Sequence, residues 1–229
     1  LVGSEMCIRD SLDSRCAEYF KMGALFTKWR AVISIGNSLP SQGCIEENAK
    51  LLARYAKIVQ KNNMVPIVEP EVLMDGSHSI EECYDATSRT LKSLFQNLEE
   101  ENVDITGTIL KPNMVTPGSE HQEKIGVETV AKETLRCLHE CVPGNLPAIT
   151  FLSGGQSETV STEHLDAMNK IGGFPWKLSF SYGRALQAGA LKAWLGKSEN
   201  VDAAQSAFSH RALMNKKAAL GQWSKDLEV

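Results

Sequence analysis

The chain has 229 residues, of which 42% are hydrophobic and 23% charged, as in ordinary folded globular domains. Its formal net charge of −4 lacks the basic excess that nucleic-acid binding requires, so we expect no nucleic-acid partner. No apolar run reaches the about 18 residues that span a bilayer, and we expect no membrane partner either.

Residues 1–11 (LVGSEMCIRDS) do not begin with methionine and have neither the apolar run nor the Arg- and Ser-rich character of a targeting peptide. Their composition also connects poorly to that of the segments after residue 11. We assign no fold to residues 1–11, interpret them as an extraneous leader, and expect one domain over residues 12–229.

From about residue 14, short β-rich apolar runs alternate with longer segments of helical periodicity. Strands are predicted at residues 28–35, 65–73, 106–114, 148–155 and 177–184. Helices are predicted at residues 44–62, 79–101, 121–141, 161–170, 184–196 and 201–220. Alternation of strand and helix is typical of a parallel α/β architecture.

Several charged residues lie inside the predicted strands, namely Lys28, Arg30, Glu69, Glu71 and Lys111. Strands buried on both faces of a doubly wound sheet rarely tolerate such charges. In a (β/α)₈ barrel they are expected, because strand ends point into the mouth of the active site. Since five strands are predicted and a barrel needs eight, either three more precede this sequence or the sheet is open.

Lys111 ends its strand directly before Pro112. A lysine at the inner end of an apolar strand is partly desolvated. Desolvation and a second nearby cation both lower its pKa, giving the neutral amine that attacks a carbonyl. The alternative, more common for such a segment taken alone, is that Lys111 extends to solvent.

Two pairs of charged residues lie two positions apart, which places each pair on one face of a strand. Glu69 and Glu71 could divide acid–base work, one as proton donor and the other ionised. Lys28 and Arg30 suit an anionic substrate and could depress the pKa of another lysine. The alternatives are a solvent-facing strand end, or a structural network in which the two pairs bind each other.

Two turns of small residues come after successive strands. Consecutive glycine amides form anion-binding nests, and the N-terminus of a helix after the turn adds positive potential. Barrels commonly hold phosphate in the loops after strands 7 and 8. The candidate phosphate ligands are Ser153, Gly154, Gly155, Ser181, Gly183 and Arg184.

The spacing of Cys137, His139 and Cys141 does not favour a metal site. On a helix the two cysteines share a face, whereas His139 points elsewhere. The six cysteines are too dispersed for a disulfide framework, which indicates reduced thiols and a cytoplasmic compartment.

Together these stretches resemble the class I, Schiff-base fructose-bisphosphate aldolases. The match runs in order from about Leu12 to about Trp223, through KWRAVISIG, NAKLLARYAKIVQKNNMVPIVEPEVL, LKPNMVTPG, FLSGGQSE and FSYGRALQ…LKAWLGK. The resemblance implies a (β/α)₈ TIM barrel that is incomplete here, with about five of eight βα units, strands 4 to 8.

The resemblance also implies roles for the candidate residues. Lys111 would form the imine with the substrate ketone, and Glu69 would be the general acid/base, with Glu71 and Lys28 beside it. Arg30 would face the second phosphate. The phosphate nearest the ketone would bind Ser153, Gly154, Gly155, Ser181, Gly183 and Arg184.

The implied reaction is reversible cleavage of fructose 1,6-bisphosphate to dihydroxyacetone phosphate and glyceraldehyde 3-phosphate. The protonated imine is the electron sink, so no metal or cofactor is implied. The full-length family member would be a homotetramer in the cytoplasm, with a plastid as the alternative. Other functions left open are a non-catalytic barrel remnant that binds a ligand, and an aldolase for another phosphorylated ketose.

The chain departs from the family at both ends. The first three strands are missing, along with an aspartate and a lysine of the implied site, and the C-terminal tail is replaced by GQWSKDLEV. Five parallel strands cannot close a barrel and leave two edges unpaired. We therefore expect this polypeptide alone to be poorly soluble and at most weakly active.

Overall fold

The computed structural model describes residues 11–228 and contains one sheet of five parallel strands in the order β1-β2-β3-β4-β5. The strands are β1 Phe26–Ile33, β2 Val65–Val72, β3 Ile109–Leu110, β4 Ala148–Phe151 and β5 Lys177–Phe180. All five predicted strands are present and in chain order, which confirms the parallel α/β architecture.

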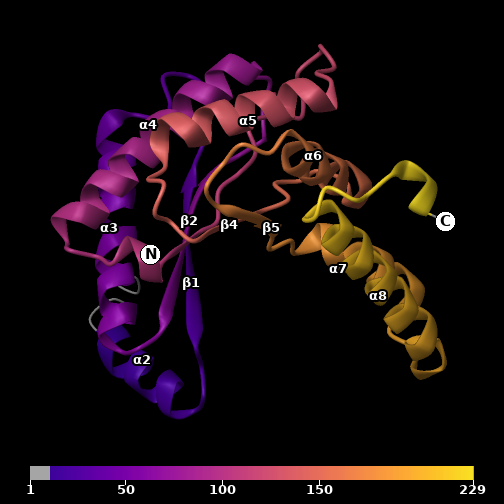
Figure 1. Cartoon of the computed structure of the whole chain (residues 1–229), viewed down its shortest axis with the longest axis horizontal. Coiled ribbons are helices and arrows are strands. Elements are labelled where there is room, and N and C mark those ends of the chain that lie inside the picture. The colour runs from indigo at the N-terminus through magenta and orange to yellow at the C-terminus, as the bar shows by residue number, and fades with distance from the viewer. Residues whose placement is uncertain (1–10, 229) are drawn as a thin grey trace.

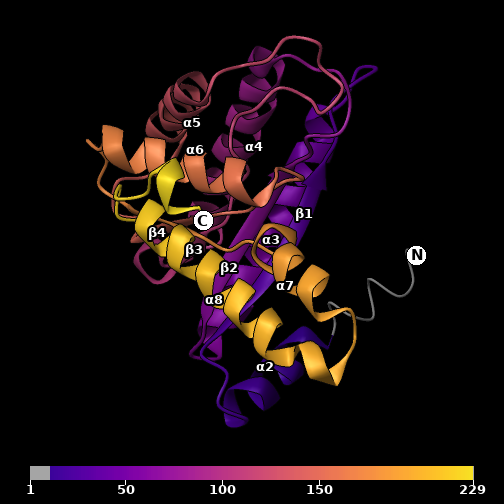
Figure 2. The same ribbon diagram turned by 90° about the vertical axis from the view of Figure 1, so that its right-hand side faces the viewer.

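Seven α-helices accompany the sheet among the described residues. They are α2 Leu12–Lys21, α3 Gln42–Lys61, α4 Ile80–Glu100, α5 Val127–Cys141, α6 Glu158–Ile171, α7 Arg184–Trp194 and α8 Val201–Ala218. Short 3₁₀ turns are η1 Ile105–Gly107, η2 Ser198–Asn200 and η3 Lys225–Leu227. Helices α3 to α6 form an arc around the outside of the strands, and α7 and α8 extend away from it (Figures 1 and 2).

Helices α3 and α4 begin and pack as their sequences predict. The Ser41 side chain accepts from the Cys44 amide at the start of α3, and Ser79 and Glu82 form a capping box at the start of α4. The apolar stripe of α3 is buried at Ile45, Ala49, Leu52, Ala56 and Val59. These two helices fix the chain on either side of β2 and so hold its carboxyl end in place.

Strand β3 is much shorter than the predicted 106–114. The Asp104 side chain accepts from the Thr106 amide at 2.9 Å and folds the start of the segment into η1. At the other end, Pro112 has no amide proton to donate to a ladder. The predicted strands at 148–155 and 177–184 likewise end at Phe151 and Phe180, where glycine-containing turns begin.

The sheet ends at β1 and β5, each of which has one neighbouring strand within residues 11–228. Leu25 and Phe26, at the start of β1, are 71% and 63% exposed. Five adjacent parallel strands wrapped on one side by helices are the arrangement of a partial (β/α)₈ barrel, as predicted.

The prediction of a leader over residues 1–11 lies almost wholly outside the described residues, and the single domain over 12–229 stays a prediction. Helix α2 was not predicted from the sequence. Over residues 11–228, no helix has the length and apolar character needed to cross a bilayer.

Candidate active site

Three of the predicted catalytic side chains meet on the sheet: Lys28 and Glu69 lie within β1 and β2, and Lys111 comes directly after β3. Each Glu69 carboxylate oxygen forms an ion pair with one lysine: Lys28 Nζ lies 2.8 Å from Oε2, and Lys111 Nζ lies 3.0 Å from Oε1. Glu69 is almost fully buried and the Lys111 side chain is only 11% exposed. Lys111 therefore does not extend to solvent, which was the alternative for that residue.

The fourth predicted catalytic residue, Glu71, pairs with Arg30. Arg30 Nε donates to Glu71 Oε2, and this bond raises the pKa of the Arg30 guanidinium. The Glu71 side chain is 8% exposed and that of Arg30 is 47% exposed. The lysine–arginine pair of β1 thus binds the glutamate pair of β2, which is the structural alternative, and Lys111 joins the same network through Glu69.

The strand register explains why these charges meet. Strands β1 and β2 are parallel with Arg30 opposite Glu69, and residues two apart on a strand share a face. The Lys111 amide donates to the Val68 carbonyl at 2.8 Å, which extends the ladder by one residue and brings Lys111 beside Glu69. The cluster therefore arises from backbone pairing rather than from a loop.

Asn113 fixes the position of the segment that carries Lys111. Its Oδ1 accepts from the Val72 amide at 3.0 Å, and its Nδ2 donates to Thr87 Oγ1 at 3.0 Å. Asn113 thereby ties the ends of β2 and β3 to α4. Sequence reasoning missed this residue, because an asparagine after a strand is usually read only as a turn signal.

The first predicted phosphate turn comes after β4. Gly154 and Gly155 have φ of 54° and 89°, and the Gln156 amide donates to the Ser153 carbonyl at 2.9 Å. The Leu152 amide donates to the Pro112 carbonyl at 3.1 Å, so this turn lies next to the segment after Lys111. The positive φ values explain why glycine occupies both positions.

The second predicted phosphate turn comes after β5, the neighbouring strand. The Ser181 amide donates to the Phe151 carbonyl at 2.9 Å, which aligns the ends of β4 and β5. Gly183 immediately precedes α7 with no side-chain cap, and α7 begins at the exposed Arg184. The two turns thus follow neighbouring strands, and the first of them lies beside the segment after Lys111.

Residues 11–228 contain no group of three or more His, Cys, Asp or Glu side chains able to hold a metal ion. Cys137 and Cys141 lie on the buried face of α5, whereas the exposed His139 ring lies 5.3 Å from that of Trp176. The two cysteines and His139 therefore point apart, as their spacing predicted.

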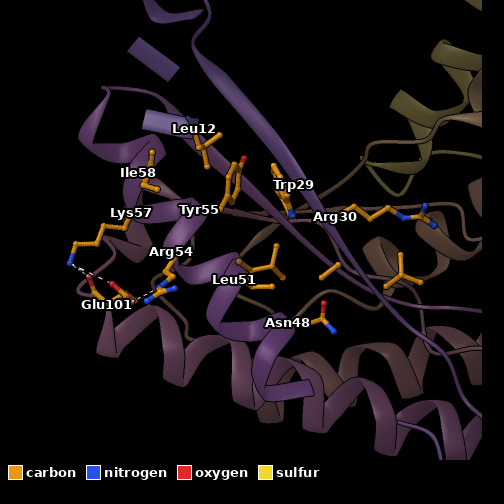
Figure 3. Close-up of a pocket in the computed structure, with 13 residues that line it drawn as sticks. Leu12, Trp29, Arg30, Asn48, Leu51, Arg54, Tyr55, Lys57, Ile58 and Glu101 are labelled. Atoms are coloured by element: carbon orange, nitrogen blue, oxygen red, sulfur yellow. Dashed lines mark hydrogen bonds and ion pairs between the residues drawn. The ribbon is translucent and has the colours of Figure 1, made fainter. Parts of the chain in front are cut away.

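A cavity of about 600 Å³ lies between β1 and α3, and Arg30 is among the residues that line it (Figure 3). The Trp29 ring faces Tyr55 with centroids 5.9 Å apart, and Arg54 and Lys57 lie near Glu101 at the rim. Trp29 therefore points toward the helices, opposite to the charged residues on either side of it in β1.

The model of the glycolytic class I fructose-bisphosphate aldolase family matches residues 4–229. The chain belongs to this family. Its relatives include cytosolic fructose-bisphosphate aldolase 4 of Arabidopsis thaliana, 53% identical over 96% of this chain and 56% of the relative. A probable class 1 aldolase of Xanthomonas axonopodis pv. citri is 52% identical over 93% of this chain and 64% of the relative.

A solved structure of fructose-bisphosphate aldolase from Plasmodium falciparum superposes on this aldolase chain with a TM-score of 0.93 and 47% identity. That comparison covers 94% of this chain and 63% of the other. The chain thus spans between 56% and 64% of the lengths of these aldolases.

Proposed function

We propose that this chain carries the imine-forming part of an aldolase that reversibly cleaves fructose 1,6-bisphosphate to dihydroxyacetone phosphate and glyceraldehyde 3-phosphate. The observation that carries the proposal is the buried Glu69 carboxylate with the Lys28 and Lys111 ammonium groups on its two oxygens. A lysine held beside a carboxylate at a strand end has both a nucleophile and a proton carrier within reach.

In the proposed reaction Lys111 first passes a proton to Glu69, and its neutral amine then attacks the ketone carbon of the substrate and forms a carbinolamine. Glu69, which lies 3.0 Å from Lys111 Nζ, transfers the proton with which the hydroxyl leaves as water. The iminium ion that results accepts the electron pair of the carbon–carbon bond as that bond breaks, while a base from the remaining units of the barrel takes the proton of the hydroxyl that becomes the aldehyde oxygen. Lys28, on the other oxygen of Glu69, stabilises the carboxylate between these proton transfers.

The two phosphates of the substrate would bind on opposite sides of Lys111. The phosphate nearest the ketone would bind the turn amides, the two serines and the guanidinium at the ends of β4 and β5, from Ser153, Gly154, Gly155, Ser181, Gly183 and Arg184. Arg30, whose side chain is 47% exposed and projects from the middle of β1, would face the second phosphate. A bisphosphate would span both sets, which favours it over a ketose with one phosphate.

Borohydride trapping tests the proposal. The protein is incubated with dihydroxyacetone phosphate, reduced with borohydride and digested, and the adduct is located by mass spectrometry. We expect the adduct on Lys111. A folded protein that forms no adduct would support the alternative, a barrel remnant that only binds ligands.

We also propose that the remaining units of the barrel cover the outer edge of β1 in the whole protein. That edge strand has one neighbour within residues 11–228, and exposed Phe26 and Leu25 flank it. We further propose that the whole protein is a homotetramer in the cytosol. The compartment is proposed because relatives such as the Arabidopsis thaliana aldolases 4 and 6 are described as cytosolic. A soluble, monomeric 229-residue chain with full cleavage activity would contradict the expected dependence on those units.

A further inference from the structure

Gln156 joins the first phosphate turn to two other parts of the molecule. Its backbone amide closes the turn on the Ser153 carbonyl. Its side-chain Oε1 lies 2.6 Å from His164 Nδ1, and its Nε2 donates to Met114 Sδ at 3.6 Å. His164 belongs to α6, and Met114 lies shortly after Lys111 in the chain, so this one side chain links helix, turn and nucleophile segment.

The His164 ring is buried and acts as a fixed donor. His164 is 5% exposed and lies on the inner face of α6 beside the fully buried Leu165. Burial lowers the pKa of His164 to about 4, so the ring is neutral near pH 7 and carries its proton on one nitrogen. Because the amide oxygen of Gln156 can only accept, that nitrogen is Nδ1.

The turn needs such support because its own residues are permissive. Gly154 and Gly155 adopt positive φ, and glycine has many other conformations open to it. Amides bind an anion well only if they already converge before it arrives. Without a donor at position 164, the Gln156 oxygen would lose its 2.6 Å partner, and the side chain would favour a conformation that returns it to water.

We propose that His164 is a positioning residue that acts through Gln156 to hold the Ser153-Gly154-Gly155 turn in the shape that binds a phosphate monoester. This inference rests on the function proposed above. The link to Met114 extends the same support to the spacing between the turn and Lys111. His164 does not touch the substrate in this scheme.

Two substitutions of His164 distinguish the effect of its hydrogen-bond donor from the effect of its side-chain volume. His164→Asn keeps a donor where Nδ1 lies, and His164→Leu fills a similar volume without one. With ¹⁵N-labelled glycine in the whole protein, the amide signals of Gly154 and Gly155 are followed as inorganic phosphate is added. We expect both signals to shift in the wild-type and His164→Asn proteins, and half-saturation to need about tenfold more phosphate in His164→Leu.

Kinetics distinguish positioning from a loss of folded protein. We expect His164→Leu to raise KM for fructose 1,6-bisphosphate about tenfold while kcat changes by less than about threefold, because the phosphate contact serves ground state and transition state alike. Partial unfolding would instead lower the apparent kcat at unchanged KM. Glu163→Gln, on the same helix and partly exposed, is the matched control and should behave as wild type.

Gln156→Leu keeps the inference testable if His164→Leu does not fold. It should weaken phosphate binding by a similar factor, and adding His164→Leu to it should cost little more, because both remove the same contact. Unchanged phosphate affinity in folded Gln156→Leu or His164→Leu, with responsive glycine amides in the wild type, overturns the inference and leaves the proposed function standing. Glycine amides that ignore phosphate in the wild type would overturn the inference and the proposed phosphate site, whereas the borohydride adduct on Lys111 tests imine formation separately.

Discussion

The two halves of the candidate site are built by different means. On β1, β2 and the residue after β3, charged side chains hold one another: Glu69 lies between Lys28 and Lys111. At the ends of β4 and β5, the predicted phosphate ligands are mostly backbone amides in turns. The first half depends on strand register, which the whole sheet maintains, whereas the second depends on a few residues behind the turns. Substitutions should therefore act on chemistry in the first half and on binding in the second.

The largest expected effect is that of Lys111→Arg. Arginine keeps a positive charge for Glu69 but is not deprotonated in proteins, so it cannot form an imine. We expect no borohydride adduct at this position and a loss of cleavage activity of roughly 10⁴-fold or more. Lys177→Arg, at the exposed start of β5, is the control and should retain both. An Lys111→Arg protein that still cleaves at the normal rate would refute the central role of this lysine.

Glu69→Gln should show how much the ion pairs of the side-chain half contribute to the free energy of unfolding. The substitution leaves the ammonium groups of Lys28 and Lys111 facing a neutral amide. Removing one partner of a buried ion pair lowers the free energy of unfolding by about 3 kcal/mol. Glu71→Gln is the matched comparison, because its partner Arg30 is half exposed and can turn to water, so about 1 kcal/mol is expected. Urea unfolding measures both, and equal losses would contradict the distinction.

Glu69→Gln should also slow the reaction itself. If Glu69 transfers the proton in carbinolamine dehydration, its loss should lower kcat by roughly 10²- to 10⁴-fold. Single-turnover formation of the imine isolates this step from product release. A normal rate of imine formation would show that another group carries the proton.

Gly155→Ala should act on the turn half through its backbone. A φ of 89° is strained for alanine, and its Cβ would lie 3.3 Å from Met74 Cε. We expect a loss of about 2 kcal/mol in unfolding free energy and weaker phosphate binding. Gly43→Ala, in α3 with open space around it, is the control and should be neutral or stabilising by up to about 1 kcal/mol. Equal effects of the two substitutions would show that the turn tolerates other shapes.

The contrast between the two halves of the site also shows how much of it could be predicted from the sequence. Alternation along strands is a local rule, so it placed Lys28 with Arg30 and Glu69 with Glu71, each pair on one face, and offered a network between the two pairs as an alternative. The sequence also predicted turns at Gly154, Gly155 and Gly183, of which the first two have positive φ.

What the sequence could not show was how distant segments meet. The contact of Gln156 with His164 depends on the rotation of α6 against the turn, and that of Asn113 with Thr87 depends on the packing of α4. No spacing rule encodes either. The length of β3 was mispredicted for a related reason, since the Asp104 side chain competes with the ladder for the Thr106 amide.

The smallest expected effect is a pH dependence of stability carried by His164. Burial lowers its pKa in the folded protein to about 4 from an ordinary value of 6.5. Between these values the unfolded chain binds a proton that the folded chain excludes, so this contribution is complete above pH 6.5 and is lost as the pH falls toward 4.

From about pH 7 to about pH 5.5, we expect wild-type protein to lose about 1 kcal/mol more unfolding free energy than His164→Asn, which has no such group. His78, whose pKa burial also lowers, is present in both proteins and cancels in the difference. Chemical denaturation at several pH values measures this difference, and parallel curves would mean that the ring reaches water and does not serve the turn as a fixed, neutral donor.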